Sequence, residues 1–440
     1  DYTISCATES GRLWLEYIDL RKKSHQVYCD NRLALEFYKE HRKEMDAGFE
    51  VTWPERYDRK TEVSAIQSAM EKKIKNPETF ASEYQQIGIN LNEVQTPVIT
   101  AKEFAGKMIT NATLGTVPDW CQELVAFVDI QEECLFWCVM GFKNDFTAFV
   151  ADYGTYPEIP YRIFTKQQVK KWQLLSNDFL QSNAINPSNW VVDDKGVVKV
   201  APEAKYTHGV DRAVTLLKNK VYRRLDTYQT PMRIRMVGID ATRGQNTNVV
   251  RQYCAANSSQ DLRLFPHFGQ YISPNNIQMA EQQRKPGWIF ESDWNRNSRT
   301  CKWILKQTSQ FGYEFHTETS MTKDFLMARI AAPIGSPGCM YLYGADPYVH
   351  ELFTAHVCES EYPQQTIGKI VKNQWKERSN AQDNDWLDCL VGCCTLASYC
   401  HATYDTIDLN IGKAEVPSIS QIAAEMRAKA ANQIYNYDYI

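Results

Sequence analysis

The sequence lacks the motifs of several common enzyme classes. No GxxxxGK[ST] phosphate-binding loop occurs in the 440 residues, so the chain encodes no cradle for the phosphates of ATP. The eight histidines show no HxxxH or HExxH spacing, and the 13 cysteines form no pair of CxxC motifs, which argues against a zinc site. We therefore expect reduced, mostly buried thiols. No signal peptide is visible and no apolar run reaches the roughly 18 residues of a membrane span, so we expect an intracellular protein without a membrane partner.

The composition is that of a globular protein with little net charge. Hydrophobic residues make up 43% of the chain and charged residues 23%, and the net charge is -4. A chain of this length is too long for one ordinary core, which predicts two or three domains. The slightly acidic balance gives no overall attraction to nucleic acid, but it does not exclude a local basic groove.

Three hydrophobic segments each lead into an aspartate. LVAFVDIQ (124–131) reads as a buried strand that reaches Asp129, MVGID ends at Asp240, and Asp388 lies near the start of an apolar helix predicted from about Trp386 to Cys400. Strand ends are where open α/β sheets place their chemistry. Three converging carboxylates repel one another, and a hard divalent cation such as Mg²⁺ or Mn²⁺ relieves that repulsion. Any one of these aspartates is more typical of a turn or helix cap, so the prediction depends on the set.

The remaining pattern predicts a helical segment followed by a mixed α/β sheet flanked by helices. Residues 1–95 are mainly helical in pattern, and 96–118 read as a linker with a short helix behind Thr100. ELVAFVDIQ, CLFWCVMGF and FTAFVADYG then predict an antiparallel meander, after which strands alternate with helices. We also predict one long helix over 210–228 and another over 301–309. The sheet domain is predicted over 119–405, with a C-terminal tail at 406–440 that ends in a helix.

Four segments resemble a known family, the large subunits of tailed-bacteriophage terminases, in its lambda-like branch. CQELVAFVDIQEECLFWCVMGFKNDFTAFVADYGTYPE resembles the first nuclease motif of that family, and NDWLDCLVGCCTLA resembles its closing motif. FYKEHRKEMDAGFEVTWPERY, with SAIQSAM and FASEYQQIG, is similar to the end of its ATPase domain, and KEFAGKMI with GTVPDW is similar to its linker. The segments occur in the order found in the family, and VGIDATRG lies between them.

The resemblance implies an RNase H-like nuclease domain in which three acids bind two divalent ions. By motif, Asp129 corresponds to the first acid, Asp240 to the second and Asp388 to the third. Asp385 lies one helical turn earlier on the same face, where it is either an auxiliary ligand or a neutral surface group. Asp293, another strand-end acid in WIFESDW, is interpreted as structural.

The implied activity is that of a metal-dependent endonuclease that cuts concatemeric double-stranded DNA during viral packaging. The expected partners are a small terminase subunit, the portal protein and further copies of the chain in the assembled motor, in the host cytoplasm. Because the family couples its nuclease to an ATPase, the missing phosphate loop has two explanations: the front of the ATPase domain lies outside this chain, which the match of residues 1–95 to the end of that domain favours, or the chain is a relative without a motor. Two alternatives remain: a non-catalytic docking module for DNA or portal, and a resolvase- or integrase-type RNase H-like nuclease.

Basic side chains near the predicted site are candidates for DNA contacts. Arg243 directly follows the Asp240 strand, where it would meet a phosphate. A basic cluster precedes the Asp388 helix and comprises Lys369, Lys372, Lys376 and Arg378. A second cluster, predicted on a helix, comprises Lys218, Lys220, Arg223 and Arg224. Each of the two clusters is also typical of a solvated face, and the first is the better candidate for DNA.

Overall fold

The computed structural model describes most of the chain. The described residues are 8–85, 97–183, 190–192, 194, 198–242, 244–272, 288–291, 301–367, 371–379 and 383–400. Four sequence predictions fall outside them: Arg243, Lys369, Asp293 and the tail at 406–440.

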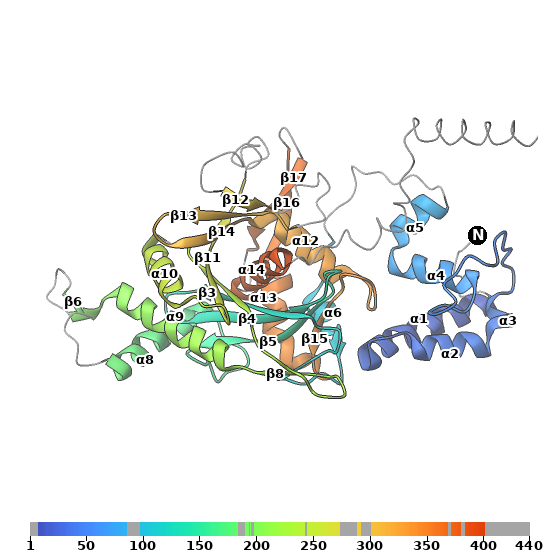
Figure 1. The fold of residues 1–440 in the computed structure, drawn as a ribbon, viewed down its shortest axis with the longest axis horizontal. Helices are drawn as coiled ribbons and strands as arrows, with labels where there is room; N and C mark the ends of the chain where they lie inside the picture. Colours follow the sequence, from blue (N-terminus) through green and yellow to red (C-terminus); the bar gives the residue numbers. More distant parts are fainter. Residues whose placement is uncertain are drawn as a thin grey trace, which may run out of the picture.

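A large mixed sheet organises the described part of the chain (Figure 1). Within the described residues it has ten strands, in the spatial order β1 (Met108–Ile109), β15 (Met340–Tyr343), β5 (Ala148–Tyr156), β4 (Leu135–Phe142), β3 (Glu123–Ile130), β10 (Met236–Asp240), β11 (Arg263–Gln270), β14 (Gly312–Glu318), β13 (Trp303–Thr308) and β12 (Trp288–Glu291). Strands β3, β4 and β5 form the predicted antiparallel meander, whereas β3, β10, β11 and β14 run parallel to one another. The prediction of a mixed sheet flanked by helices is therefore confirmed.

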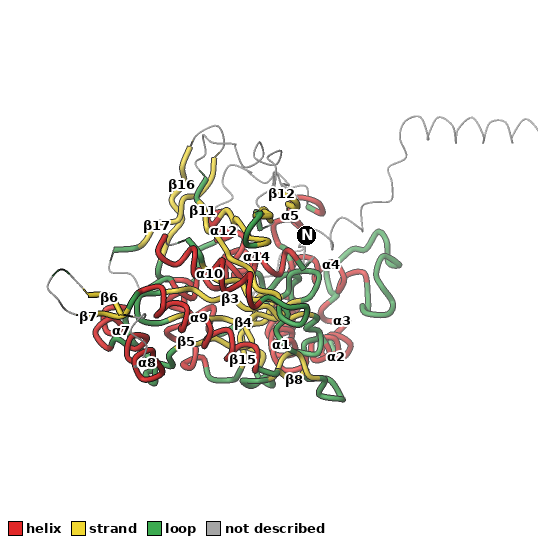
Figure 2. The backbone as a smooth tube through the Cα atoms, turned by 60° about the vertical axis from the view of Figure 1, so that its left-hand side comes forward, coloured by secondary structure: helices red, strands yellow, loops and turns green. Residues whose placement is uncertain are grey.

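Three smaller sheets accompany the large sheet within the described residues. They are the hairpin β16 (Glu361–Ile367) with β17 (Val371–Glu377), the three strands β2 (Thr116–Val117), β8 (Tyr222–Arg224) and β9 (Pro231–Met232), and the hairpin β6 (Trp190–Val192) with β7 (Val198–Val200). The β16–β17 hairpin projects from the body of the molecule in both backbone views (Figures 1 and 2). This hairpin leads directly toward the segment that contains Asp388.

Alternate residues of β3 face two separate cores because successive side chains of a strand point to opposite faces. Val125 and Phe127 pack into one core with α12 (Thr319–Ala331), α13 (Glu351–Cys358) and α14 (Asp385–Tyr399). The intervening residues pack into the other core with α9 (Pro202–Asn219) and α10 (Gly244–Asn257). Asp129 has the same parity as Phe127 and so lies on the α14 face.

The N-terminal helices form a unit with a core of its own, drawn in blue in Figure 1. They are α1 (Glu9–Tyr28), α2 (Arg32–Glu40), α3 (Arg42–Met45), α4 (Ala65–Lys75) and α5 (Pro77–Tyr84). Trp14, Tyr17 and Tyr38 are buried there, and the Trp14 indole donates a hydrogen bond to the Met45 carbonyl at 3.0 Å. The helical pattern predicted for this segment is confirmed, while its assignment as the end of an ATPase domain stays a prediction.

The segment predicted as a linker is partly integrated with the sheet. Thr100 caps α6 (Ala101–Ala105) in a capping box, as the sequence indicates. Phe104 of α6 packs near Phe353 of α13, with ring centroids 6.3 Å apart, and β1 pairs with β15 at the sheet edge.

Two predicted helices differ from the structure. Residues 303–308 form β13 because Trp303 and Leu305 alternate toward the core against β14, a period-2 pattern that a short apolar run does not distinguish from a helix. The predicted helix 210–228 is α9, which ends at Asn219, and Tyr222–Arg224 become β8. The other helices of the described chain are α7 (Lys166–Trp172), α8 (Leu174–Asn183) and the 3-10 helix η2 (Pro347–His350).

Two expectations about the whole chain can also be compared with the described residues. The twelve cysteines among them are all free thiols, and ten are buried. No helix among these residues combines the length and the hydrophobicity needed to span a membrane.

Candidate metal centre

Two predicted site residues lie side by side because their strands are parallel neighbours. Val128 of β3 pairs with Ile239 of β10, so that Asp129 and Asp240 occupy the next position of each strand. Neighbouring strands are about 4.8 Å apart, and residues in register point to the same face. The carboxyl ends of β3 and β10 therefore present two aspartates on the α14 face.

Close packing around Phe127 brings α14 to this sheet edge. A Cβ on Gly392 of α14 would lie 1.9 Å from Phe127 Cδ2, and one on Gly238 of β10 would lie 2.8 Å from it. Only glycines allow both backbones to approach the ring this closely. Because Asp129 follows Phe127 by two residues, the first turn of α14, with Asp385 and Asp388, is brought to the Asp129 side chain.

Asp129, Asp240 and Asp388 line one cleft, with a volume of about 380 Å³. Four carboxylates and two ammonium groups border it. The lining residues are Phe127, Asp129, Gln131, Lys166, Asp240, Thr242, His267, Gly269, Thr319, Lys323, Glu377, Asn384, Asp388 and Val391. Asp385 is not part of this lining and is fully buried behind it. We refer to this space as the carboxylate cleft.

Asp129 is a buried carboxylate whose surroundings disfavour its negative charge. Its residue is 5% exposed, and the Gln131 side-chain amide donates a hydrogen bond to it at 2.5 Å. Burial raises the pKa of Asp129 well above its ordinary value, and the charges of Asp385, Asp240 and Asp388, in that order, raise it further. The four aspartates thus act on one another electrostatically, which is the condition that a divalent cation relieves.

Asp385 has a cationic partner in Lys166. The Lys166 ammonium lies 2.7 Å from Asp385 Oδ1, although the geometry leaves both buried carboxylate oxygens without a directed hydrogen bond. Burial raises the pKa of Asp385 to about 6, with Lys166 opposing the rise and Asp383 and Asp388 adding to it. Carboxylate oxygens without a directed hydrogen bond have lone pairs that can coordinate a cation.

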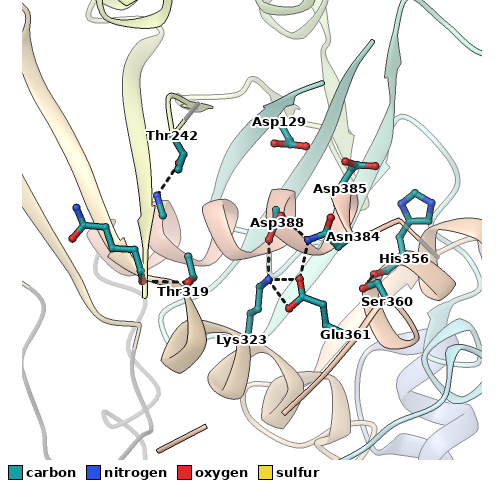
Figure 3. Close-up of polar contacts among 12 residues, drawn as sticks. Asp129, Thr242, Thr319, Lys323, His356, Ser360, Glu361, Asn384, Asp385 and Asp388 are labelled. Atoms are coloured by element: carbon teal, nitrogen blue, oxygen red, sulfur yellow. Dashed lines mark hydrogen bonds and ion pairs between the residues drawn. The ribbon is translucent and has the colours of Figure 1, made fainter. Parts of the chain in front are cut away.

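Asp388 belongs to a hydrogen-bonded network with Lys323, Glu361 and Asn384 (Figure 3). The Lys323 ammonium lies 3.1 Å from Asp388 Oδ1 and donates to both oxygens of Glu361 at 2.8 and 2.9 Å. The Asn384 amide donates to Asp388 Oδ2 at 3.1 Å and to Glu361 Oε1 at 2.8 Å. Burial lowers the pKa of Lys323, but the carboxylates of Asp388 and Glu361 raise it above its ordinary value.

Asp240 is oriented by the loop that follows it. The Thr242 hydroxyl donates to Asp240 Oδ1 at 2.7 Å, and the Thr242 amide donates to the same oxygen at 3.2 Å. The Gly269 amide in turn donates to the Thr242 hydroxyl at 3.2 Å. His267, which pairs with Asp240 in the sheet, is neutral because burial lowers its pKa to about 3.

The donor set fits a hard divalent cation by chemistry, because the cleft offers carboxylate oxygens and no thiolate. The carboxylate oxygens of Asp385 without a directed hydrogen bond and the raised pKa of Asp129 also favour a bound cation. Within the described residues, however, no three His, Cys, Asp or Glu side chains are arranged to hold one ion. Both oxygens of Asp388 have other partners, Lys323 and Asn384.

The structure separates the two predicted basic clusters. Lys376 and Arg378 lie exposed at the end of β17, next to Glu377, which borders the cleft. The side chain of Lys372 is outside the described part, as are Lys369 and Arg243. The second cluster lies partly on α9, which packs on the opposite face of the sheet, and partly on β8 rather than on a helix.

Sequence reasoning missed Lys166, Lys323, Gln131 and Thr242. Lys323 pairs with Asp388 from 65 residues away in sequence and Lys166 pairs with Asp385 from a separate helix, so no local spacing marks either lysine. Gln131 and Thr242 each lie two residues after an acid, a spacing that favours a side-chain hydrogen bond back to it and is the only sequence signal available.

Comparisons with known proteins point to one family. The model of the family described as "Terminase large subunit gpA, endonuclease domain" matches residues 50–409. A mutant nuclease domain of the large terminase subunit gp2 of bacterial virus Sf6 with manganese is 11% identical, with a TM-score of 0.33, over 67% of this chain and 97% of that one. The HK97 bacteriophage large terminase is 12% identical, with a TM-score of 0.28, over 76% of this chain and 50% of that one. The curated proteins gave no match.

Proposed function

Because the chain belongs to the family of terminase large subunits, within their endonuclease domain, we propose that its carboxylate cleft is the site of metal-dependent DNA cleavage. The family makes the chain a nuclease of viral DNA packaging. The proposal adds the location, the metal and the substrate form: concatemeric double-stranded DNA, cut with the help of two Mg²⁺ or Mn²⁺ ions.

One observation carries the proposal. A buried aspartate at the end of a central strand lies within electrostatic reach of three others, and only one side-chain hydrogen bond to it, from Gln131, is described. Such a group is destabilised unless a cation or a proton joins it. A bound divalent cation would neutralise this buried charge in the folded protein and would also supply the metal for DNA cleavage.

Asp129, Asp240 and Asp388 would hold the ions, with Asp385 as the nearest further carboxylate. When bound, such ions supply an activated water and stabilisation of the departing 3′ oxygen in phosphodiester hydrolysis. The chain's own residues orient these ligands. Gln131 fixes one oxygen of Asp129, and Thr242 fixes one oxygen of Asp240. The neutral imidazole of His267 adds no positive charge to compete with an ion.

DNA would approach over the β16–β17 hairpin. Lys376 and Arg378 are exposed there, and Lys166 borders the cleft with a partly exposed ammonium. Charge-assisted contacts from such side chains to phosphates position a duplex without reading its sequence. Arg243 and the other predicted contacts, Lys369 and Lys372, are proposed as part of the same track.

The cellular setting follows from the family and belongs to the proposal. We place the protein in the host cytoplasm, with a small terminase subunit for site choice, the portal protein and further copies of the chain in the assembled motor. DNA and the packaging machinery are the partners that the family implies in general.

Replacing Asp129 by Ala tests the proposal. We expect plasmid cleavage in Mg²⁺ or Mn²⁺ to fall by about a hundredfold or more, because a lost ion ligand removes several kcal/mol of transition-state stabilisation. The measurement is the rate of supercoiled plasmid loss at fixed protein concentration, with EDTA as the metal-free reference.

Asp152→Asn is the matched control. Asp152 is equally buried, at 5% exposure, but its carboxylate pairs with Lys220 and Tyr222 away from the cleft. This variant should cleave at the wild-type rate. Undiminished cleavage by folded Asp129→Ala protein would contradict the proposed site and favour a non-catalytic role for the aspartates.

A further inference from the structure

A second cavity lies where the N-terminal helical unit meets the sheet domain, and it shares no lining residue with the carboxylate cleft. Its volume is about 130 Å³. His25 of α1 and Lys75, the last residue of α4, line it from the N-terminal unit. Lys143, in the turn between β4 and β5, and Ser336, in the loop that follows α12, line it from the sheet domain. We refer to this space as the junction cavity.

Direct contacts between the two units hold the walls of the junction cavity together. The Thr110 amide, next to β1, donates to the Gln26 carbonyl of α1 at 2.8 Å, and the Gln26 side-chain amide donates to the Gly106 carbonyl at 3.1 Å. The His25 ring lies directly on Gly335, where a side chain would overlap it. A ligand in the cavity would therefore touch both units at once.

Two polar side chains of the cavity have hydrogen-bonding capacity to spare. Ser336 is 4% exposed, and its hydroxyl has no hydrogen-bond partner within the described part of the chain. His25 Nε2 is also buried there without a directed hydrogen bond. Burial, and then the charge of Arg21, lowers the pKa of His25 to about 4 against the opposing effect of the Asn31 side chain, so the ring is neutral at pH 7. Since buried polar groups are normally hydrogen-bonded, Ser336 and His25 favour a polar ligand.

The ion pairs around the cavity leave an excess of positive charge. The Lys75 ammonium lies 3.5 Å from Glu71, whose carboxylate is already held by Arg21 at 3.1 Å. The Lys143 ammonium lies 2.9 Å from Asp145. These three cations and two carboxylates leave one positive charge, and the side chains of the two lysines are 38% and 37% exposed, so both can turn toward a ligand. The excess favours an anion.

The other acids near the cavity are paired or screened. Burial raises the pKa of Cys29, a further lining residue, to about 11, and the charges of Asp119 and Asp30 add to that rise. Asp30 pairs with Arg32 at 2.7 Å, and Asp119 is exposed, so salt and water screen its charge.

We propose that the junction cavity binds one tetrahedral oxyanion, a phosphate, between Lys75 and Lys143, with the Ser336 hydroxyl as a donor. The volume of about 130 Å³ equals that of about four water molecules at roughly 30 Å³ each, which is enough for a phosphate. It lies below the roughly 300 Å³ of sites for larger organic ligands, so a nucleoside does not fit. The phosphate is either the free ion or one group of a DNA backbone. Because the lysines come from different units, the bound phosphate fastens the N-terminal unit to the sheet domain.

Titration of the full chain with inorganic phosphate tests the proposal, by calorimetry in EDTA at constant ionic strength. Wild-type protein should bind one phosphate, and its melting temperature should rise with phosphate but not with chloride. Lys75→Met and Lys143→Met should each weaken binding about tenfold or more, because each removes a charge-assisted contact. Ser336→Ala removes a neutral donor and should weaken binding about threefold to tenfold.

Lys72→Met is the matched control. Lys72 belongs to α4 like Lys75, but its ammonium lies over the Tyr84 ring at 5.5 Å and does not line the cavity. This variant should bind phosphate as the wild type does, and thermal melting without phosphate verifies that every variant is folded. Wild-type protein without saturable phosphate binding, or equal binding by the three folded cavity variants, overturns the proposal.

A short DNA duplex without terminal phosphates, titrated in the same buffer, distinguishes the two sources of the phosphate. Duplex affinity that falls in Lys75→Met and Lys143→Met, but not in Lys72→Met, assigns a backbone phosphate to the cavity. Free phosphate is the ligand if its binding depends on these two lysines while duplex affinity is unchanged.

Discussion

The aspartates of the cleft fall into two pairs that the chain treats differently. Asp385 and Asp388 belong to the first turn of α14, and each has a lysine within about 3 Å, Lys166 at 2.7 Å and Lys323 at 3.1 Å. Asp129 and Asp240 close two parallel strands, where Asp129 accepts a hydrogen bond from the Gln131 amide and Asp240 accepts two from Thr242. The helix pair therefore has lysine partners, and the strand pair accepts hydrogen bonds from neutral donors.

The difference shows how a strong cation site can coexist with a stable fold. Four ionised aspartates without counter-charges would destabilise the sheet edge, and four lysine-paired aspartates would have little affinity left for a metal. The lysines offset part of the repulsion at the helix pair, while burial and acidic neighbours still raise the pKa values of Asp129 and Asp385. Each of the following predictions breaks or sharpens this contrast.

Separating the two pairs should have the largest effect. Gly392→Ala places a Cβ 1.9 Å from Phe127 Cδ2, so α14 must move away from β3. We expect the free energy of unfolding to fall by about 1–3 kcal/mol, the usual cost of overpacking, together with a loss of plasmid cleavage. Urea denaturation measures the first effect. Gly106→Ala, whose new Cβ meets only ordinary contacts at 3.5 and 3.6 Å, is the control and should change neither quantity.

Neutralising one member of each pair should shift metal-free stability in opposite directions. Asp129→Asn removes an uncompensated buried charge, so we expect a gain of about 1–2 kcal/mol in EDTA. Asp388→Asn removes a partner of Lys323 and should cost about 1 kcal/mol. The measurement is urea denaturation at neutral pH without divalent ions. A shift of the same sign in both variants would mean that the two pairs are electrostatically alike.

The free energy of unfolding should depend on pH through the titration of Asp385. The pKa of Asp385 is raised to about 6 in the folded protein, so the folded state holds its proton more tightly than the unfolded state does. This favours folding below about pH 4, and the contribution is lost as the pH rises toward about 6. In EDTA, wild-type protein should lose about 1 kcal/mol more than Asp385→Asn between pH 5 and pH 7.5. Parallel stability curves for the two proteins would exclude this titration.

The smallest effect concerns the orientation of a strand aspartate. Thr242→Val removes the hydroxyl that donates to Asp240 at 2.7 Å, while the backbone amide still donates at 3.2 Å. We expect cleavage to slow by about two- to tenfold, the value of one hydrogen bond of roughly 0.5–1.5 kcal/mol. Thr242→Ser retains the hydroxyl and should cleave at nearly the wild-type rate, which separates the hydrogen bond from packing.

The parts of the fold encoded locally could be predicted from the sequence. Continuous apolar runs identified β3, β4 and β5, the N-cap residue Thr100 marked α6, and the apolar run from Trp386 located α14. The resemblance extended this to a terminase nuclease domain, and the matching family model is that of a terminase endonuclease domain. Short apolar runs such as 303–308 were assigned wrongly because their strand character depends on a distant partner, β14.

Of the residues that line the site, only the acidic ones could be predicted from the sequence. Asp129, Asp240 and Asp388 border one cleft, although their roles as ion ligands stay predictions. Lys323 and Glu361 were not predictable because their pairing joins α12 to β16 across 38 residues. Asp385, given as a secondary candidate, is the largest acidic influence on the pKa of Asp129. Sequence patterns identify the charges at the ends of elements, and tertiary packing decides which of those charges are already neutralised.

Arg21 of α1 binds the loop that follows α12. Its guanidinium is held by Glu71 of α4 at 3.1 Å and donates to the carbonyls of Ile334 and Gly335 at 2.5 and 3.0 Å. Those carbonyls lie in the loop that continues α12, the helix that carries Lys323. The N-terminal helical unit thus contacts the chain just beyond the C-terminal end of α12, and Lys323 near the other end of that helix lines the carboxylate cleft. One helix therefore joins the N-terminal unit to the wall of the candidate site.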